Sequence, residues 1–329
     1  MESIARIRHA AVPTAPYTRQ TPNPPFVIPP PTNWTTPMKI VPSYDNVDPS
    51  FLSNKDLAII TQNGLEQVAQ DSAAHWEYEN RRVAQPILDY LYLGPSNVAR
   101  DRKWLRDEGI TMILAARDTK QAGLKIMAFD KLAEEMGIEA RYLDVAGYHE
   151  LIPAFPSAIR MINDHMLRVY REQAVKTAQI DPETGDMVVD ESSIKRGKVL
   201  VFCETGNDRS ASVVSAYIMA ILGLSAAQVC QFLTYKRFCV SMDEDLKHTL
   251  RAYEDILLAQ RTVHQHELKD YSHLARGDIQ QKKTKRGIDE TVDDDGDDGM
   301  TGVNQFEGSD QERFLGRDNF TPFVDAPAE

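Results

Sequence analysis

Cysteine is scarce in this chain, which has three among its 329 residues, at Cys203, Cys230 and Cys239. An odd and low count builds no disulfide framework, and these positions show no zinc-ligand spacing, so the sequence indicates a reducing compartment. There is no run of about 18 apolar residues, so we expect no transmembrane helix. The N-terminus lacks the apolar core of a secretory signal. We therefore expect a cytoplasmic or nuclear protein, or one found in both places.

Basic residues are in deficit, because 37 lysines and arginines stand against 49 acids and the net charge is −12. This balance argues against nucleic acid and anionic membranes as partners. The acids are unevenly spread, since a run near the C-terminus holds Asp289, Glu290, Asp293, Asp294, Asp295, Asp297 and Asp298. A basic cluster, Lys282–Arg286, precedes this run. It is either a nuclear-import signal, read by an import partner, or part of a solvated tail.

Composition divides the chain into four parts. Residues 1–50 form a proline-rich arm, expected to be disordered and to act as a spacer or as a ligand for a proline-binding domain. A helical lead-in follows at 51–83, and the main domain covers 84–264. Within that domain, 173–197 is a polar insertion that is expected to be a surface loop or hairpin. Residues 265–329 are expected to form a disordered acidic tail.

Short apolar runs alternate with helical patterns along the main domain. This alternation predicts an α/β fold with a parallel-type sheet flanked by helices on both faces. The predicted strands are 87–93, 111–116, 138–145 and 198–202. The predicted helices are 96–107, capped by Ser96, then 122–136, 156–172, 209–222, 225–237 and 243–262.

The stretch from Lys198 to Ser210 carries the chemistry. It has the pattern of a buried strand, a tight loop and a helix start, and the loop holds Cys203 and Arg209 with five residues between them. A thiolate at the base of such a loop can attack phosphorus and form a cysteinyl-phosphate, which water then hydrolyses. Backbone N–H groups and the helix N-terminus favour both the thiolate and a bound phosphate. The sequence therefore predicts a phosphate-binding loop with a nucleophile, and this chemistry requires no metal or other cofactor.

Individual side chains of this loop have expected roles. Cys203 is the nucleophile, and Arg209 is expected to hold two phosphate oxygens. Ser210 is expected to donate a hydrogen bond to the sulfur, and Gly206 lets the loop bend tightly around the anion. The predicted phosphate-binding segment is Cys203, Glu204, Thr205, Gly206, Asn207, Asp208 and Arg209. The alternative, a core cysteine beside a surface arginine, is disfavoured by the strand–loop–helix context.

Motifs between Gln85 and Gln260 carry a family resemblance. They are Ile87–Gly94, Gly109–Thr111, Tyr142–Val145, the loop Cys203–Arg209, the helix start Arg209–Met219 and Arg237–Cys239. The region resembles the cysteine-based protein tyrosine phosphatases, specifically the dual-specificity group, and looks most like the STYX subgroup of phosphoserine/threonine/tyrosine-interacting proteins. The Lys285–Arg286 pair before the acidic run is also similar. The resemblance implies a dual-specificity-phosphatase-like domain and phosphorylated proteins as partners.

One departure from the family pattern lies directly before the nucleophile. The family has a histidine there, which organises the loop and helps to keep the thiol ionised, whereas this chain has Phe202. Phenylalanine offers neither effect, so the Cys203 thiolate should be less populated.

A second departure concerns the general acid. In the family a Leu-Asp-x-Ala-Asp stretch ends in the proton-donating aspartate, and the matching stretch here, Leu143–Gly147, ends in Gly147. Loss of a positioned acid typically costs about 10²–10⁴ in rate. His149 and Glu150 are nearby substitutes, while Asp144 is expected to have a structural role.

A third departure is the pair of loop carboxylates, Glu204 and Asp208, which should weaken the binding of a phosphate dianion. Glu204 is expected to face solvent. Asp208 stands just before the loop arginine, as in lipid phosphatases of the myotubularin type. We hypothesise that Asp208 protonates the leaving group.

Two functions compete at this point. Cys203 and Arg209 favour a slow phosphatase acting on phosphotyrosine or phosphoserine/threonine proteins. Phe202 and Gly147 favour a pseudophosphatase that binds phosphoproteins without efficient hydrolysis. Because an aryl phosphate leaves without an acid more easily than an alkyl phosphate, any activity should favour phosphotyrosine-like substrates.

Overall fold

The computed structural model describes residues 24–29, 36–42, 52–123, 128–180, 187–188 and 194–275. Its centre is a five-stranded sheet with the order β3–β4–β9–β5–β6. The strands are β3 (Gln85–Leu88), β4 (Leu91–Pro95), β5 (Met112–Arg117), β6 (Glu139–Asp144) and β9 (Val199–Cys203). Strands β4, β9, β5 and β6 are parallel, and β3 is antiparallel to β4. The predicted α/β fold is confirmed.

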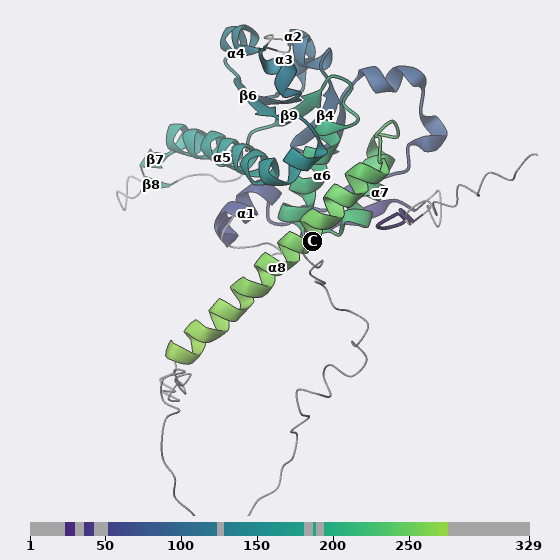
Figure 1. Ribbon diagram of the computed structural model, residues 1–329. Coiled ribbons are helices and arrows are strands. Elements are labelled where there is room, and N and C mark those ends of the chain that lie inside the picture. Colours follow the sequence, from purple (N-terminus) through teal and green to yellow (C-terminus); the bar gives the residue numbers. More distant parts are fainter. Residues whose placement is uncertain are drawn as a thin grey trace, which may run out of the picture. The chain divides into compact units, whose positions relative to one another are not determined.

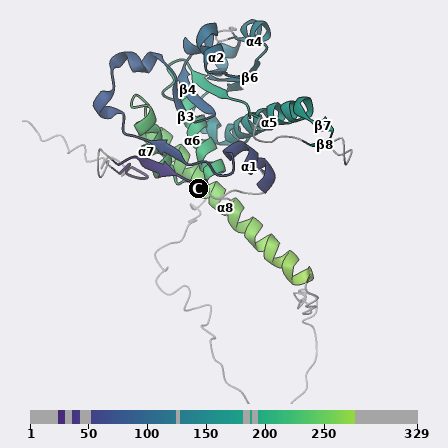
Figure 2. The same cartoon turned by 180° about the vertical axis from the view of Figure 1, so that it is seen from behind.

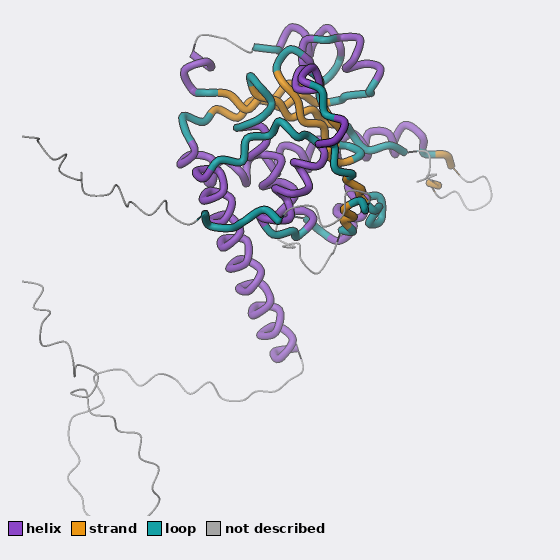
Figure 3. Tube along the Cα trace, turned by 90° about the vertical axis from the view of Figure 1, so that its right-hand side faces the viewer, coloured by secondary structure: helices purple, strands orange, loops and turns teal. Residues whose placement is uncertain are grey.

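Helices cover both faces of this sheet (Figures 1 and 3). On one face lie α5 (Leu151–Thr177), α6 (Arg209–Leu222), α7 (Ala226–Lys236) and the first half of α8 (Glu244–Ala275); on the other lie α2 (Arg102–Asp107) and α4 (Asp130–Met136). The central strand β9 shows why its sequence is continuously apolar. Val199, Val201 and Cys203 belong to one buried cluster, whereas Leu200 and Phe202 belong to the other. Successive side chains point to opposite faces, so a strand buried on both sides has no polar position.

The predicted strand 87–93 is instead a hairpin of β3 and β4. The two residues between these strands, Asp89 and Tyr90, form the turn. Gln67 donates to Asp89 from its side-chain amide (2.9 Å) and accepts from the Asp89 N–H (3.1 Å), and Arg196 pairs with the same carboxylate. Tertiary contacts therefore hold this turn, which carries no glycine or proline signal for a sequence pattern to detect.

Two predicted helices are shorter than expected. The segment 96–107 divides into a 3-10 turn, η4 (Val98–Arg100), and α2, whose cap is Asp101 rather than Ser96. The segment 122–136 begins as α3 (Thr119–Gly123) and ends as α4, and residues 124–127 between them lie outside the described part. Asp101 accepts from the Trp104 N–H at 3.0 Å, which is the capping geometry that the prediction assigned to Ser96.

Two other helices are longer than expected. Helix α5 starts at Leu151 instead of residue 156 and ends at Thr177 instead of residue 172. It tolerates Pro153 in its first turn, where a missing N–H costs nothing, and it also contains Pro156. Helix α8 continues past residue 262 to Ala275, so the start of the predicted tail is helical. No glycine or proline interrupts the sequence between 263 and 276, which permits the extension.

The segments before the main sheet contain more than the predicted helix. Strand β1 (Met38–Ile40) comes from the arm that was expected to lack structure, and it pairs antiparallel with β2 (Gln67–Ala69). The lead-in consists of α1 (Asn54–Thr61), β2 and two 3-10 turns, η2 (Ala73–His75) and η3 (Tyr78–Arg82). Helix α1 lies beside α5 (Figures 1 and 2). The lead-in was predicted to be helical with a break at Asn63–Gly64, and the described residues have α1 before this break and β2 after it.

The insertion contains a short antiparallel pair, β7 (Gln179–Ile180) and β8 (Met187–Val188), as expected for a hairpin. The basic cluster, the acidic run and most of the proline-rich arm lie outside the described residues. Within the described ranges, no helix has both the length and the apolar character needed to span a bilayer.

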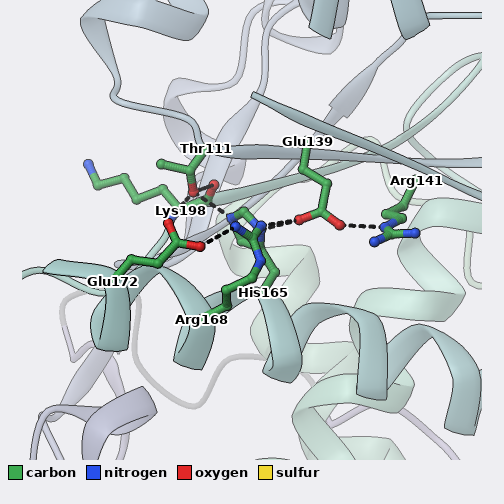
Figure 4. Close-up of polar contacts among 7 residues, drawn as sticks. All are labelled: Thr111, Glu139, Arg141, His165, Arg168, Glu172 and Lys198. Atoms are coloured by element: carbon green, nitrogen blue, oxygen red, sulfur yellow. Dashed lines mark hydrogen bonds and ion pairs between the residues drawn. The ribbon is translucent and has the colours of Figure 1, made fainter. Parts of the chain in front are cut away.

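A polar network joins the starts of three parallel strands to α5 (Figure 4). His165 contacts Glu139 through Nδ1 (2.6 Å to Oε2) and Thr111 through Nε2 (2.7 Å to Oγ1). The Thr111 hydroxyl also accepts from the Lys198 N–H at 2.9 Å. Because these residues sit at the amino ends of β5, β6 and β9, the network lies at the edge of the sheet opposite to Cys203. Its contacts tie the amino ends of these strands to one another and to α5.

Burial and hydrogen bonds within this network shift the pKa values of Glu139 and His165. Burial alone would raise the pKa of Glu139, but hydrogen bonds from His165, Arg141 and Arg168 lower it to about 2. Burial lowers the pKa of His165, so the ring is held in its neutral form. Acid therefore disrupts both partners of the His165–Glu139 contact.

Glu139→Gln should lower the free energy of unfolding at neutral pH by about 1.5–3 kcal/mol, the range for a hydrogen bond to a charged group. The folded pKa of about 2 lies below the usual value of about 4.3. The contribution of Glu139 is therefore present above that usual value and is lost as the pH falls toward the folded pKa. Urea unfolding at neutral pH and at about pH 4 should show that the variant loses less stability on acidification than the wild type.

Glu172→Gln is the matched control, because within the described part of the chain Glu172 forms only an exposed pair with Arg168, four residues before it. Its effect should be at most about 0.5 kcal/mol. Equal losses in the two variants would contradict a special role for Glu139.

Candidate active site

Cys203 is the last residue of β9, the central strand, and it is flanked by β4 and β5. Helix α6 begins at Arg209, so residues 203–209 connect the carboxyl end of a parallel strand to a helix N-terminus. Ligands of α/β folds bind at this edge of the sheet. The free N–H groups and the dipole of the helix favour an anion there.

The sulfur of Cys203 lies in a ring of hydrogen-bond donors. The Gly206 N–H and the Ser210 hydroxyl each donate to Sγ at 3.1 Å. Burial opposes ionisation of the thiol, but the Ser210 hydroxyl and the N–H groups of Ser210, Asp208 and Gly206 outweigh it and lower the pKa of Cys203. The structure thus places Ser210 where the sequence expected it, and the site favours a thiolate.

Gly206 gives the loop its shape. Its φ of +76° lies in the left-handed region, and a Cβ atom there would come within 2.5 Å of the carbonyl carbon of Gly94. Both the backbone angle and the close approach to β4 therefore require glycine.

Arg237 fixes the loop from behind, and the sequence had marked it only as part of a motif. This arginine is fully buried and donates to the carbonyl oxygens of Gly206 (3.1 Å) and Thr205 (3.2 Å). It also donates to the carbonyls of Val83 (2.8 Å) and Arg81 (2.9 Å) on the segment before β3. Because Arg237 binds the carbonyl oxygens of these loop peptides, the N–H groups on the other side of the loop point away from Arg237 and toward the sulfur.

The remaining loop side chains have different surroundings. Thr205 Oγ1 lies 3.9 Å from the sulfur and accepts from the Asn207 N–H at 3.2 Å. The Asn207 side-chain oxygen accepts from Arg237 and Cys239, each at 3.2 Å. Glu204 is exposed, as expected, and its carboxylate accepts from Gln121 at 3.3 Å.

Arg209 makes an ion pair that the sequence did not predict. Its Nη2 donates to Asp118 Oδ2 at 2.9 Å. Asp118 directly follows β5, so it reaches the same edge of the sheet as Cys203. The available signal was its position just after the predicted strand 111–116, because the carboxyl ends of parallel strands share one edge.

A cavity of about 160 Å³ lies beside Arg209, and its lining residues are Val145, Gly147, Tyr148, Leu151, Asp208 and Arg209. Gly147 and Asp208, the two positions considered for the general acid, therefore face one cavity. Tyr148 donates to Asp243 at 3.0 Å. Burial and this hydrogen bond raise the pKa of Tyr148 to about 12, so its hydroxyl stays protonated at neutral pH.

The other candidate acids are less well placed. Glu150 accepts from the Ala146 N–H at 2.5 Å, and the side chain of His149 is 79% exposed. Neither residue lines the cavity. Asp144 pairs with Arg117, in keeping with the structural role expected for it.

Phe202 points away from the loop. It is buried on the opposite face of the sheet, where its ring packs edge-on against Phe129 with centroids 4.9 Å apart. Position 202 therefore offers the loop no polar group. The pKa of Cys203 is lowered nonetheless, because its donors come from the loop and from Ser210.

Residues 91–256 match the family model described as dual specificity phosphatase, catalytic domain. The chain belongs to this family. The matched region begins in β4 and ends in α8, so it contains the whole loop, the cavity and Asp118.

The relatives agree with this dual specificity phosphatase assignment. The human serine/threonine/tyrosine-interacting protein is 30% identical over 201 residues, which cover 60% of this chain and 76% of the relative. The mouse protein of the same name is 29% identical over 196 residues, covering 59% and 74%. Human dual specificity protein phosphatase 26 is 33% identical over 136 residues, covering 41% and 51%. The predicted resemblance, including its STYX-like character, is confirmed.

Among solved structures, the chain is similar to human tyrosine phosphatase-like serine/threonine/tyrosine-interacting protein. The TM-score is 0.41 at 27% identity, and the match covers 54% of this chain and 99% of that chain.

Ser210→Ala should raise the pKa of Cys203, because the Ser210 hydroxyl is the strongest of the groups that lower it. Alkylation of the thiol by iodoacetamide at neutral pH should slow, and the pH midpoint of the reaction should rise by about one unit. Ser215→Ala is the control, since this buried hydroxyl on the same helix has no hydrogen-bond partner among the described residues. Identical alkylation profiles for both variants and the wild type would contradict thiolate stabilisation by Ser210.

Proposed function

We propose that this chain is a slow protein phosphatase whose best substrates are phosphotyrosine-like aryl phosphates. The observation that supports this proposal most strongly is the environment of Cys203, whose sulfur accepts from Gly206 and Ser210 and whose pKa is lowered. A pocket that only captures phosphoproteins needs anion donors, but it has no use for a thiol nucleophile with a lowered pKa beneath them.

The proposed reaction has two steps. The Cys203 thiolate attacks phosphorus, and the S–P bond forms as the bond to the leaving oxygen breaks. Arg209 and the loop N–H groups hold the non-bridging oxygens while charge develops on them. Water then attacks phosphorus, the S–P bond breaks, and the thiolate returns as inorganic phosphate leaves. The Ser210 hydroxyl stabilises the departing sulfur.

Protonation of the leaving oxygen is the weak step. Gly147 supplies no proton, and we assign the role to Asp208, which lines the same cavity. Asp208 is poorly anchored for this task, since its Oδ2 accepts only a long hydrogen bond, at 3.5 Å, from the Thr205 hydroxyl among the described residues. A loosely held acid protonates the leaving oxygen inefficiently, so hydrolysis is slow. The fastest substrates should then be those whose leaving group needs little protonation.

The cavity favours the same class of substrate. Val145, Leu151 and Tyr148 supply apolar surface beside Arg209 and Asp208. A flat aryl ring suits such walls, because burial of its faces contributes binding energy that a short alkyl phosphate lacks.

Capture of phosphoproteins without efficient turnover is the second candidate function. Gly147 favours it, because a cavity without a fixed acid still binds phosphate but releases the leaving group slowly. Under both functions the proposed partners are phosphorylated proteins. The import and proline-binding partners, the cytoplasmic or nuclear location and the four-part domain division stay predictions.

Cys203→Ser should abolish hydrolysis of para-nitrophenyl phosphate, because a serine hydroxyl is not ionised in this loop. Cys230→Ala is the control, since that buried thiol, whose pKa burial raises to about 12, lies away from the loop. If the wild type and Cys203→Ser hydrolyse the substrate at the same background rate, the proposal that the chain is a phosphatase is rejected. Loss of phosphotyrosine-peptide binding in Arg209→Ala would then support capture alone.

Gly147→Asp should raise kcat by about tenfold or more, toward the full value of a positioned acid. The backbone accepts the change, because Gly147 is extended (φ −170°), and the nearest obstacle is the exposed His149 ring at 3.1 Å. Gly147→Ala adds the same Cβ without the acid and should not accelerate the reaction.

Asp208→Asn completes this test. It should slow the wild type clearly but slow the Gly147→Asp variant only slightly, because the new acid replaces the old one. If Asp208→Asn leaves wild-type turnover unchanged, Asp208 is not the donor.

A further inference from the structure

Helix α3 and the residue before it touch the phosphate loop at two points. Asp118 Oδ2 accepts from Arg209 Nη2 at 2.9 Å, and the Gln121 amide donates to the Glu204 carboxylate at 3.3 Å. Asp118 also anchors α3, because its Oδ1 accepts from the Lys120 N–H at 2.9 Å. The same carboxylate therefore joins the start of α3 to the arginine that binds phosphate.

The contact is made at the most important nitrogen of Arg209. A guanidinium offers two edges for a two-point contact with phosphate, Nε with Nη2 and Nη1 with Nη2. Both edges include Nη2, so an oxygen seated on Nη2 leaves at most one complete edge. A phosphoryl group entering the loop meets an arginine that already has an anionic ligand.

The neighbouring arginines do not make up for the charge of Arg209 that Asp118 neutralises. The Arg209 side chain is 31% exposed and that of Asp118 is 22% exposed, so water screens this pair only in part. Arg117, at the end of β5, and Arg237, behind the loop, are already engaged. Arg117 is paired with Asp144, and Arg237 is directed at backbone carbonyls. Neither replaces the charge that Asp118 cancels.

We propose that Asp118 is an internal competitor of the substrate's phosphoryl group for Arg209 and sets the affinity of the loop. The inference rests on the proposed function, since it concerns the same arginine. Binding of a phosphoryl group displaces the Asp118 carboxylate, and because this carboxylate anchors α3, the start of that helix shifts with it. A phosphoprotein that also contacts α3 thereby gains an advantage over a free phosphate monoester.

Binding of inorganic phosphate and of a phosphotyrosine peptide to the Cys203→Ser chain, with and without Asp118→Asn, tests the proposal. Asparagine removes the charge but keeps an oxygen that accepts from Lys120, so the start of α3 stays capped. Calorimetry should show affinities about three- to tenfold higher for both probes in the Asp118→Asn variant. In the chain with Cys203 intact, Asp118→Asn should lower KM by a similar factor without lowering kcat.

Asp101→Asn is the matched control, because Asp101 caps α2 in the same way and pairs with no described arginine. It should change neither affinity. If the Cys203→Ser chain binds the probes and adding Asp118→Asn leaves binding unchanged or weakens it, Asp118 is not a competitor of phosphate. The proposed function is then unaffected. A fall in kcat at constant KM also overturns the competitor, because Asp118 then acts in the chemical step. If neither chain binds either probe, both the competitor and the phosphate site are rejected.

Discussion

The convergence of donors on the Cys203 sulfur is the interaction on which the site depends. It lies where β9 runs into α6 through residues 204–208. Gly206 adopts a backbone angle that other residues rarely accept, and it does so against the backbone of Gly94. Arg237 takes the loop carbonyls, so that the opposite sides of the same peptide units face the sulfur. The residues that shape the loop therefore also set the hydrogen bonds to the Cys203 sulfur, and a substitution at Gly206 or Arg237 should change the pKa of the thiol.

The charged groups around this nucleophile are arranged in a way that does not favour fast turnover. The arginine needed for phosphate is paired with Asp118, Asp208 stands beside it, and the position expected to supply a proton is Gly147. Under the proposed function, the ion pair with Asp118 lowers affinity and Gly147 lowers the rate, whereas Asp208 partly replaces the missing acid. Such a site suits a substrate that needs little acid assistance and that brings binding energy from outside the phosphoryl group.

The sequence predicted those parts that depend on short-range patterns. The apolar run 198–202, the glycine in the loop and the spacing of Cys203 and Arg209 specify a strand, a turn and a phosphate clamp in adjacent residues. It missed the Asp89–Tyr90 turn, which Gln67 holds from a distant segment, and the strand β1, which exists only because β2 pairs with it. The side-chain contacts of Asp118 and Arg237 were missed for the same reason, since their partners lie 91 and 31 residues away. The position of Asp118 after a predicted strand indicated its edge of the sheet but not its partner. Contacts of that length are set by packing, and a local pattern carries no record of them.

Whether Cys203 forms a covalent bond to phosphorus is the central question, and rapid acid quenching followed by mass spectrometry answers it directly. Mixing the wild-type chain with an aryl phosphate and quenching during turnover should yield a peptide containing Cys203 that is heavier by one phosphoryl group. Breakdown of this adduct should match the release of inorganic phosphate. Phosphate release with no adduct, or with the phosphoryl group on another residue, would contradict the account.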